Sequence, residues 1–177
     1  MPECIKSTTP NFEGLYKISF EFGAINQSGS GLLLIKNFGD TTYRVVGTGI
    51  SGMTYFDLEF TNKNKFRVLQ IFKPLNKKRL VEMIKTDFQL LFLQLPRSQI
   101  SISEALENKK FDFKYKNSRW HIETSIGCDK LLNLEYLKNE KLITTIIIDS
   151  NSNQSPNNIQ IEHGTNNFKI TLKHLKQ

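Results

Sequence analysis

The sequence has few cysteines and no long apolar run. Its two cysteines, Cys4 and Cys128, lie far apart, which indicates neither a metal site nor a framework of disulfide bonds, although one bond between them is feasible. The longest apolar runs, such as residues 146–148, have the length of a strand and not of a membrane-spanning helix. We therefore expect a chain that is soluble or peripheral to a membrane.

Side chains suited to metal or acid–base chemistry are also sparse. The histidines His121, His163 and His174 have no ligand-like spacing, and we predict them at outward positions of strands. Asp57 and Glu59 alternate with apolar residues, which predicts that both carboxylates face solvent. The sequence therefore predicts no catalytic centre, no metal site and no cofactor.

The chain carries an excess of positive charge. Its formal net charge of +7 favours anionic partners, which could be nucleic acid, an anionic lipid surface or an acidic protein. Aromatic and basic side chains in residues 111–116 alternate onto opposite faces, so nucleic acid is not the predicted partner. One cluster forms a basic patch that could contact phosphates: Lys73, Lys77, Lys78 and Arg79.

Thirteen Phe and five Tyr in 177 residues favour a mostly β domain. Apolar and polar residues alternate in many short segments that are separated by Asn and Gly, and each segment is predicted to be a strand. These segments are residues 15–22, 31–36, 43–46, 53–60, 66–72, 111–115, 120–126, 131–137, 141–148, 159–163 and 168–172.

Two segments have helical features. An amphipathic helix is predicted over residues 77–93 from apolar residues at helical spacing: Leu80, Ile84, Phe88 and Leu91. Ser101 and Glu104 have the spacing of a capping box, which predicts a second, short helix that ends near Asn108.

A sheet of this many strands is expected to curl, with the long helix covering its concave face. Residues 1–12 are predicted to be a flexible tether and residues 13–177 a single domain. The cavity between sheet and helix is predicted to be lined by Tyr16, Ile18, Phe20, Leu32, Leu34, Tyr43, Val45, Phe56, Leu58, Phe60, Leu80, Ile84, Phe88 and Leu91.

The segment Gly49, Ile50, Ser51, Gly52 and Met53 places apolar side chains in a glycine-rich loop. Ser51 lacks the strand, turn and helix that surround a catalytic nucleophile. Two alternatives exist for Ile50. It packs back onto the core, or it projects and leaves water by entering a bilayer or a partner.

Three parts of the chain share a pattern with one protein family. They are residues 43–46 with Thr48, Gly52, Thr54, Phe56 and Leu58; residues 80–84; and residues 156–161 with Gly164 and residues 168–173. In this pattern of strand, protruding loop, helix and final strands, the sequence resembles the LolB family of outer-membrane lipoprotein receptors, which share a fold with the periplasmic carrier LolA.

The resemblance implies an incomplete β-barrel closed by one long and one short helix. It further implies a monomeric receptor on the periplasmic face of the outer membrane. Such a receptor would accept the acyl chains of lipoproteins from a LolA-like carrier and insert them into membrane lipid, with Ile50 or Met53 at the tip of the loop. Cys4 would be a lipid anchor, or else an incidental cysteine in a disordered tail.

The sequence departs from the family in two places. Where the family has Pro-Leu-Gly, this chain has Ile50-Ser51-Gly52, and no helix is evident before the first strand, which would leave the cavity more open. Two other functions remain open: an envelope-anchored binder of a free lipid or small apolar ligand, and a structural subunit of an envelope complex.

Overall fold

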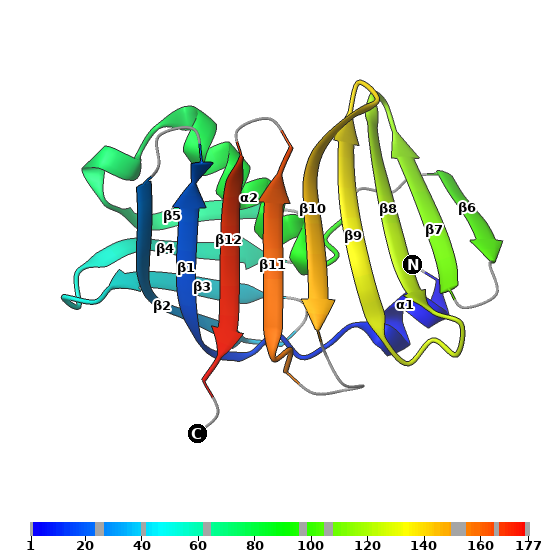
Figure 1. Ribbon diagram of the computed structural model, residues 1–177, viewed down its shortest axis with the longest axis horizontal. Coiled ribbons are helices and arrows are strands. Elements are labelled where there is room, and N and C mark those ends of the chain that lie inside the picture. The colour runs from blue at the N-terminus through cyan, green and yellow to red at the C-terminus, as the bar shows by residue number, and fades with distance from the viewer. Residues whose placement is uncertain are drawn as a thin grey trace.

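The strands form one curved antiparallel sheet (Figure 1). The computed structural model describes residues 2–23, 27–39, 42–61, 65–95, 99–104, 108–149, 155–164 and 167–175. In these ranges the sheet has twelve strands, in the order β5-β4-β3-β2-β1-β12-β11-β10-β9-β8-β7-β6. They are β1 (Gly14–Phe22), β2 (Gln27–Asn37), β3 (Tyr43–Gly49), β4 (Thr54–Thr61), β5 (Lys65–Ile71), β6 (Gln99–Glu104), β7 (Asn108–Tyr115), β8 (Ser118–Ser125), β9 (Leu131–Lys138), β10 (Lys141–Asp149), β11 (Asn158–His163) and β12 (Phe168–His174).

The sheet is two meanders joined at one seam. Strands β1 to β5 and strands β6 to β12 each pair with their neighbours in sequence, and β1 joins the two groups by pairing with β12, as at Ile18 opposite Leu172. The order therefore begins at β5 and ends at β6, so the curved sheet does not close into a barrel. This confirms the predicted mostly β fold with a helical insertion and an incomplete barrel.

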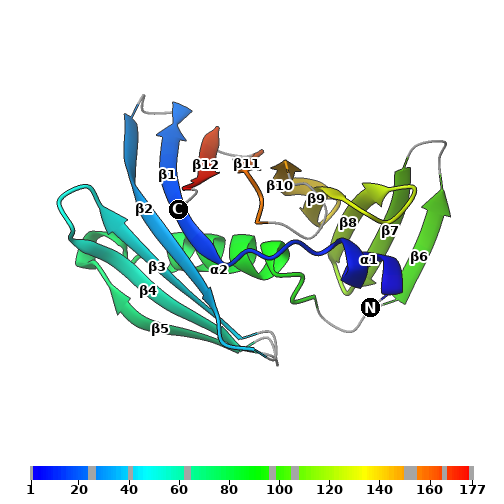
Figure 2. The ribbon, with the colours of Figure 1, turned by 90° about the horizontal axis from the view of Figure 1, so that it is seen from below.

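The long helix α2 (Lys78–Leu91) confirms the helix predicted over residues 77–93, and a short 3-10 turn, η2 (Lys73–Leu75), precedes it. A short helix, α1 (Glu3–Thr8), lies against β8. Figure 2 shows both helices on the concave side of the sheet, α2 under the first meander and the seam and α1 under the second meander. No helix in the described ranges combines the length and the apolar character needed to cross a bilayer.

The short helix predicted after Ser101 is wrong, because this segment belongs to the edge strand β6. Ile100 and Ile102 alternate with serines, and Ser101 pairs with Asp112 on β7. The period-two pattern and the neighbouring strand therefore outweigh the capping-box spacing. Residues 105–107 of the predicted helix lie outside the described residues.

The flexible tether predicted for residues 1–12 is also wrong. Ile5 and Phe12 are completely buried, and Cys4 forms a disulfide bond with Cys128, in the turn after β8. A short helix thus does precede the first strand. The disulfide bond excludes the predicted lipid attachment at Cys4, since the sulfur atom has no free thiol to acylate.

Candidate functional site: an apolar cavity beside helix α2

An apolar cavity of about 320 Å³ lies between α2 and the concave face of the sheet. Its wall crosses the seam, because β1 and β2 contribute on one side and β11 and β12 on the other. The lining residues are Ile18, Phe20, Gly31, Gly47, Thr48, Tyr55, Phe56, Phe72, Leu75, Leu80, Met83, Ile84, Asp87, Phe88, Ile161, Phe168, Ile170 and Leu172.

The two halves of helix α2 lie differently over the sheet. Residues of its first half line the cavity, whereas the residues at its C-terminal end pack against the sheet and are buried. The ring of Phe92 stacks on Tyr43 with 4.0 Å between centroids, and Phe60 and Phe88 lie 5.6 and 5.7 Å from Phe92. This aromatic cluster fills the space between the end of the helix and the sheet.

Glycines on β2 and β3 leave room for neighbouring groups in the cavity wall. A Cβ atom at Gly47 would come within 2.5 Å of the Phe56 ring, which lines the cavity from β4. Gly31 also lines the cavity, and a Cβ atom there would collide with the carbonyl of Thr48. Any larger residue at either position would displace the wall.

The predicted lining residues divide into three groups. Those that line the cavity are Ile18, Phe20, Phe56, Leu80, Ile84 and Phe88. Those that are buried in the filled core instead are Tyr16, Tyr43, Val45, Leu58, Phe60 and Leu91. The prediction places Leu32 and Leu34 on the wrong face of the sheet, because they are 40% and 45% exposed on the outer face. Leu32 pairs with the outward Lys17, so Leu33 and Ile35 face inward.

Sequence reasoning missed the rest of the wall, although part of it had a signal. Met83 and Asp87 continue the helical spacing of Leu80 and Ile84. On β12, Phe168, Ile170 and Leu172 alternate in the manner of one strand face. Tyr55, Phe72 and Leu75 had no such signal. Tyr55 lies where the pairing of β3 with β4 shifts register, Phe72 follows the end of β5, and Leu75 ends η2.

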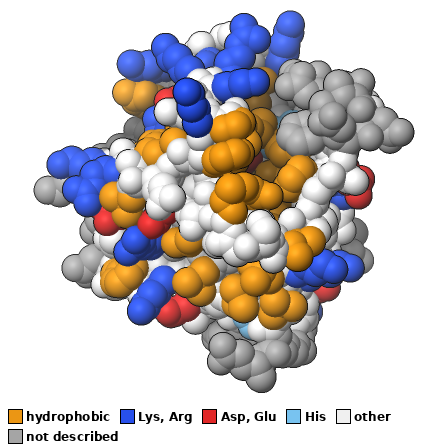
Figure 3. All heavy atoms as spheres, turned by 90° about the vertical axis from the view of Figure 1, so that its left-hand side faces the viewer, with side chains coloured by type: hydrophobic (Ala, Val, Ile, Leu, Met, Phe, Trp, Pro, Cys, Tyr) orange, Lys and Arg blue, Asp and Glu red, His pale blue; other side chains and the backbone are white. Residues whose placement is uncertain are grey.

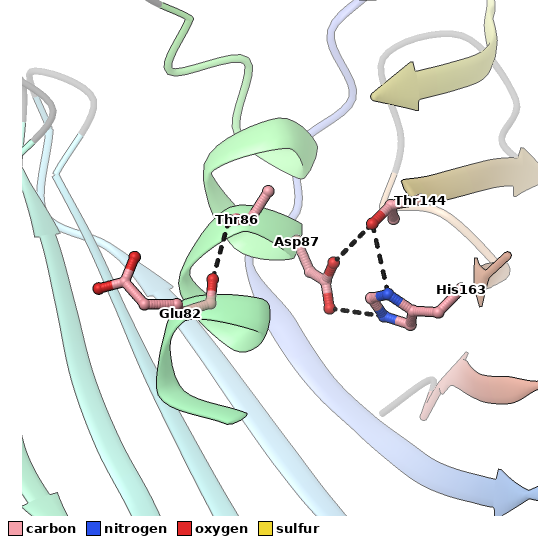
Figure 4. Close-up of polar contacts among 5 residues, drawn as sticks. All are labelled: Glu82, Thr86, Asp87, Thr144 and His163. Atoms are coloured by element: carbon pink, nitrogen blue, oxygen red, sulfur yellow. Dashed lines mark hydrogen bonds and ion pairs between the residues drawn. The ribbon is translucent and has the colours of Figure 1, made fainter. Parts of the chain in front are cut away.

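A buried polar cluster joins α2 to the sheet at the cavity wall (Figure 4). Nε2 of His163 on β11 lies 3.1 Å from Oδ2 of Asp87, and the hydroxyl of Thr144 on β10 donates to Oδ1 of Asp87 over 3.4 Å. The same hydroxyl lies 3.4 Å from Nδ1 of His163. All three side chains are buried, so the predicted outward position of His163 is wrong.

This cluster is suited to fixing α2 rather than to attacking a ligand. Thr144 is 1% exposed and does not line the cavity, so its hydroxyl is not presented to the cavity contents. Burial raises the pKa of Asp87, although hydrogen bonds and charge interactions with His163 and the bond from Thr144 act in the opposite direction. Asp87 is thus an acidic group that tethers α2 across an otherwise apolar wall.

The loop between β3 and β4 projects from the side of the molecule where α2 begins (Figure 1). Ile50 is 84% exposed and Met53 is 43% exposed, so the alternative in which Ile50 packs onto the core is wrong. The turn is tight because the backbone N–H of Gly49 donates to the carbonyl of Met53 and Gly52 has a φ of 79°. A residue with a side chain at position 52 would be strained.

The predicted basic patch lies at the same end. Figure 1 places the loop between β3 and β4 on the left side of the molecule together with η2 and the start of α2. On this side Figure 3 shows hydrophobic side chains around a hollow, with Lys and Arg side chains along its upper rim. Lys73, Lys77, Lys78 and Arg79 are all exposed there.

Solved structures of very different sequence share this fold. A LolA superfamily protein from Nitrosomonas europaea aligns with a TM-score of 0.58 at 9% identity, over 98% of this chain and 88% of that one. A candidate outer membrane lipoprotein-sorting protein domain from Vibrio parahaemolyticus aligns with a TM-score of 0.51 at 8% identity, with the same coverage. The sequence matches no family model and no curated protein. At such identities the likeness shows a LolA-like fold, and the narrower resemblance to LolB stays a prediction.

Proposed function

We propose that this protein receives the acyl chains of lipoproteins in its cavity and passes them to a membrane without catalysing a reaction. The apolar cavity beside α2 carries this proposal, because an acyl chain that enters it leaves water. Burial of each methylene stabilises the bound state by about 0.8 kcal/mol. The donor would be a LolA-like periplasmic carrier and the acceptor outer-membrane lipid.

Two further features support this function. The exposed Ile50 at a tight turn has the position that the resemblance assigns to a membrane-inserting residue. The Cys4–Cys128 disulfide bond suits an oxidising compartment such as a bacterial periplasm.

A second candidate is a carrier of one free lipid or a similar small apolar molecule. The observation that favours it is the size of the cavity, since 320 Å³ is at the lower end of the roughly 300–1,000 Å³ typical of small-molecule sites. Transfer from a loaded carrier separates the two functions, because a binder of free lipid would not accept an acylated protein.

The test is binding of a fluorescent acyl probe to wild-type protein, Ile84→Trp and Ile147→Trp. Ile84 lines the cavity, so the larger side chain should fill it and weaken binding by about tenfold or more. Ile147 lies on the outer face at 46% exposure, and its variant is the matched control. Equal affinity in all three proteins would exclude the cavity as the binding site.

A further inference from the structure

We propose that the face around the cavity mouth docks on an anionic lipid bilayer, so that the cavity opens toward the membrane. The inference rests on the proposed function, for which it provides the exit of the acyl chain. Three observations carry it: cations without acidic partners, exposed apolar side chains beside them, and the position of the cavity between the two.

The cations of this face have no ion-pair partner within the part of the chain that the structure describes. Among the described residues, none of the following four forms an ion pair, and all are exposed: Lys73, Lys77, Lys78 and Arg79. On the outer surface of the sheet the situation differs, because Arg44 pairs with Asp57 at 2.6 Å and Arg67 pairs with Glu59 at 2.9 Å. Positive charge is therefore left free at the cavity mouth.

Apolar side chains extend from the same face. Ile50 is 84% exposed, Met53 43% and Phe72 38%, and Phe72 also lines the cavity. The backbone N–H of Phe72 donates to the carbonyl of Tyr55 over 2.8 Å. This bond holds the start of β4, which follows the loop with Ile50, beside the start of the basic patch at Lys73. Charge and apolar surface thus form one continuous face.

The cavity opens within this face. Leu75 and Leu80 line the cavity, and the four cations are their close neighbours in sequence, which places the cations near its rim. Figure 3 shows Lys and Arg side chains above the hollow of this face. A bilayer fits this arrangement better than a protein does. A protein partner would need a pocket for the protruding Ile50, whereas a bilayer accepts it at any position beneath an anionic surface.

The test is flotation with vesicles of phosphatidylcholine alone or mixed with phosphatidylglycerol. Each cation near an anionic surface contributes roughly fivefold to partition. Replacing Lys73, Lys77, Lys78 and Arg79 by Gln should therefore weaken binding to the mixed vesicles by roughly 600-fold. The matched control replaces four exposed lysines of the hairpin ends in the second meander by Gln: Lys114, Lys116, Lys138 and Lys141.

The expected result is that wild-type protein and the control variant float with the mixed vesicles and not with phosphatidylcholine, whereas the basic-patch variant does not float. Equal loss in both variants would overturn the proposal, because only net charge would matter. The proposal would also be overturned if the basic-patch variant floated as well as wild-type protein but no longer accepted acyl chains from a loaded carrier. The basic patch would then bind the carrier protein and not the bilayer. Binding of the acyl probe in solution tests the proposed function separately, since none of the eight cations lines the cavity.

Discussion

Asp87 places a carboxyl group in the wall of an apolar cavity. Its two oxygen atoms contact His163 and Thr144, so the contacts of this single residue connect α2 with β10 and β11. Burial disfavours the charged form of the carboxyl group and raises its pKa above the ordinary value of 3.8. The folded state therefore holds the Asp87 proton more tightly than the unfolded chain does.

This difference predicts a pH dependence that Asp87→Asn removes. A raised pKa stabilises the fold fully below pH 3.8, and the contribution is lost as the pH rises through the raised value. The free energy of unfolding of wild-type protein relative to Asp87→Asn should thus fall with increasing pH, by at most about 1.4 kcal/mol per pH unit. Denaturant titrations of both proteins over a pH series measure it.

Asp112→Asn is the matched control, because Asp112 contacts His121 in a half-exposed pair on the outer face. Its effect on stability should stay below about 1 kcal/mol. If wild-type protein instead gains stability over Asp87→Asn as the pH rises, attraction to His163 outweighs the cost of burial.

Single residues were predictable where the pattern around them was unambiguous. Alternation places Ile18 and Phe20 on the inner face, and both line the cavity. It could not place Leu32, because residues 32–35 are all apolar and only pairing with β1 decides their orientation. The contact between Asp87 and His163 was not predictable, since the chain folds through five strands between them.

Among the elements, α1 is held in place by tertiary contacts that include a disulfide bond. Its six residues are too few for a stable isolated helix. Burial of Ile5, the disulfide bond to Cys128 and a hydrogen bond from the Ser7 hydroxyl to the Cys128 carbonyl hold it in place. The sequence could not predict this pairing, because a separation of 124 residues says nothing about distance in space.

Replacing Cys4 and Cys128 together by Ser should lower the free energy of unfolding by roughly 2–4 kcal/mol. It should also expose the N-terminal segment to proteases. Acyl binding should persist, because neither α1 nor β8 lines the cavity. Denaturation midpoints, limited proteolysis and probe binding measure the three effects. Reduction of wild-type protein should reproduce them and leave the double variant unchanged; an effect of reductant on the double variant would contradict this explanation.

Other elements show where periodicity succeeds and where it fails. The long helix was predictable because apolar residues recur over about three turns from Leu80 to Leu91. The edge strand β6 was not, because Ser101 and Glu104 imitate a helix start and its strand pattern is only six residues long. Short elements take their conformation from the neighbours that the fold provides.

At the scale of the whole molecule, uptake and delivery should be separable steps. The cavity lies inside the first meander and the seam, while Ile50 projects from the loop between β3 and β4. The sequence predicted the curved sheet and the covering helix. It could not predict which part of the concave face remains open, because that depends on how closely α2 approaches the sheet.

Ile50→Glu should therefore accept acyl chains from a loaded carrier normally and deliver them to liposomes more slowly, by about tenfold. The charged side chain opposes entry into the bilayer but lies outside the cavity. Acceptance and delivery are measured in separate transfer assays, with Ile147→Glu as control for an added charge on the outer face. Unchanged delivery by Ile50→Glu would exclude a role for the loop.

The pairing of β1 with β12 has a consequence for how the chain assembles. Hairpins within each meander can form early, because their strands are close in sequence. The pairing of β1 with β12, as at Tyr16 opposite His174, joins residues far apart in the chain and should form later. The cavity wall crosses this seam, so neither meander can offer the complete binding surface alone. During refolding, acyl binding should therefore appear only when β1 pairs with β12. The time course of probe binding would then report when the fold is complete.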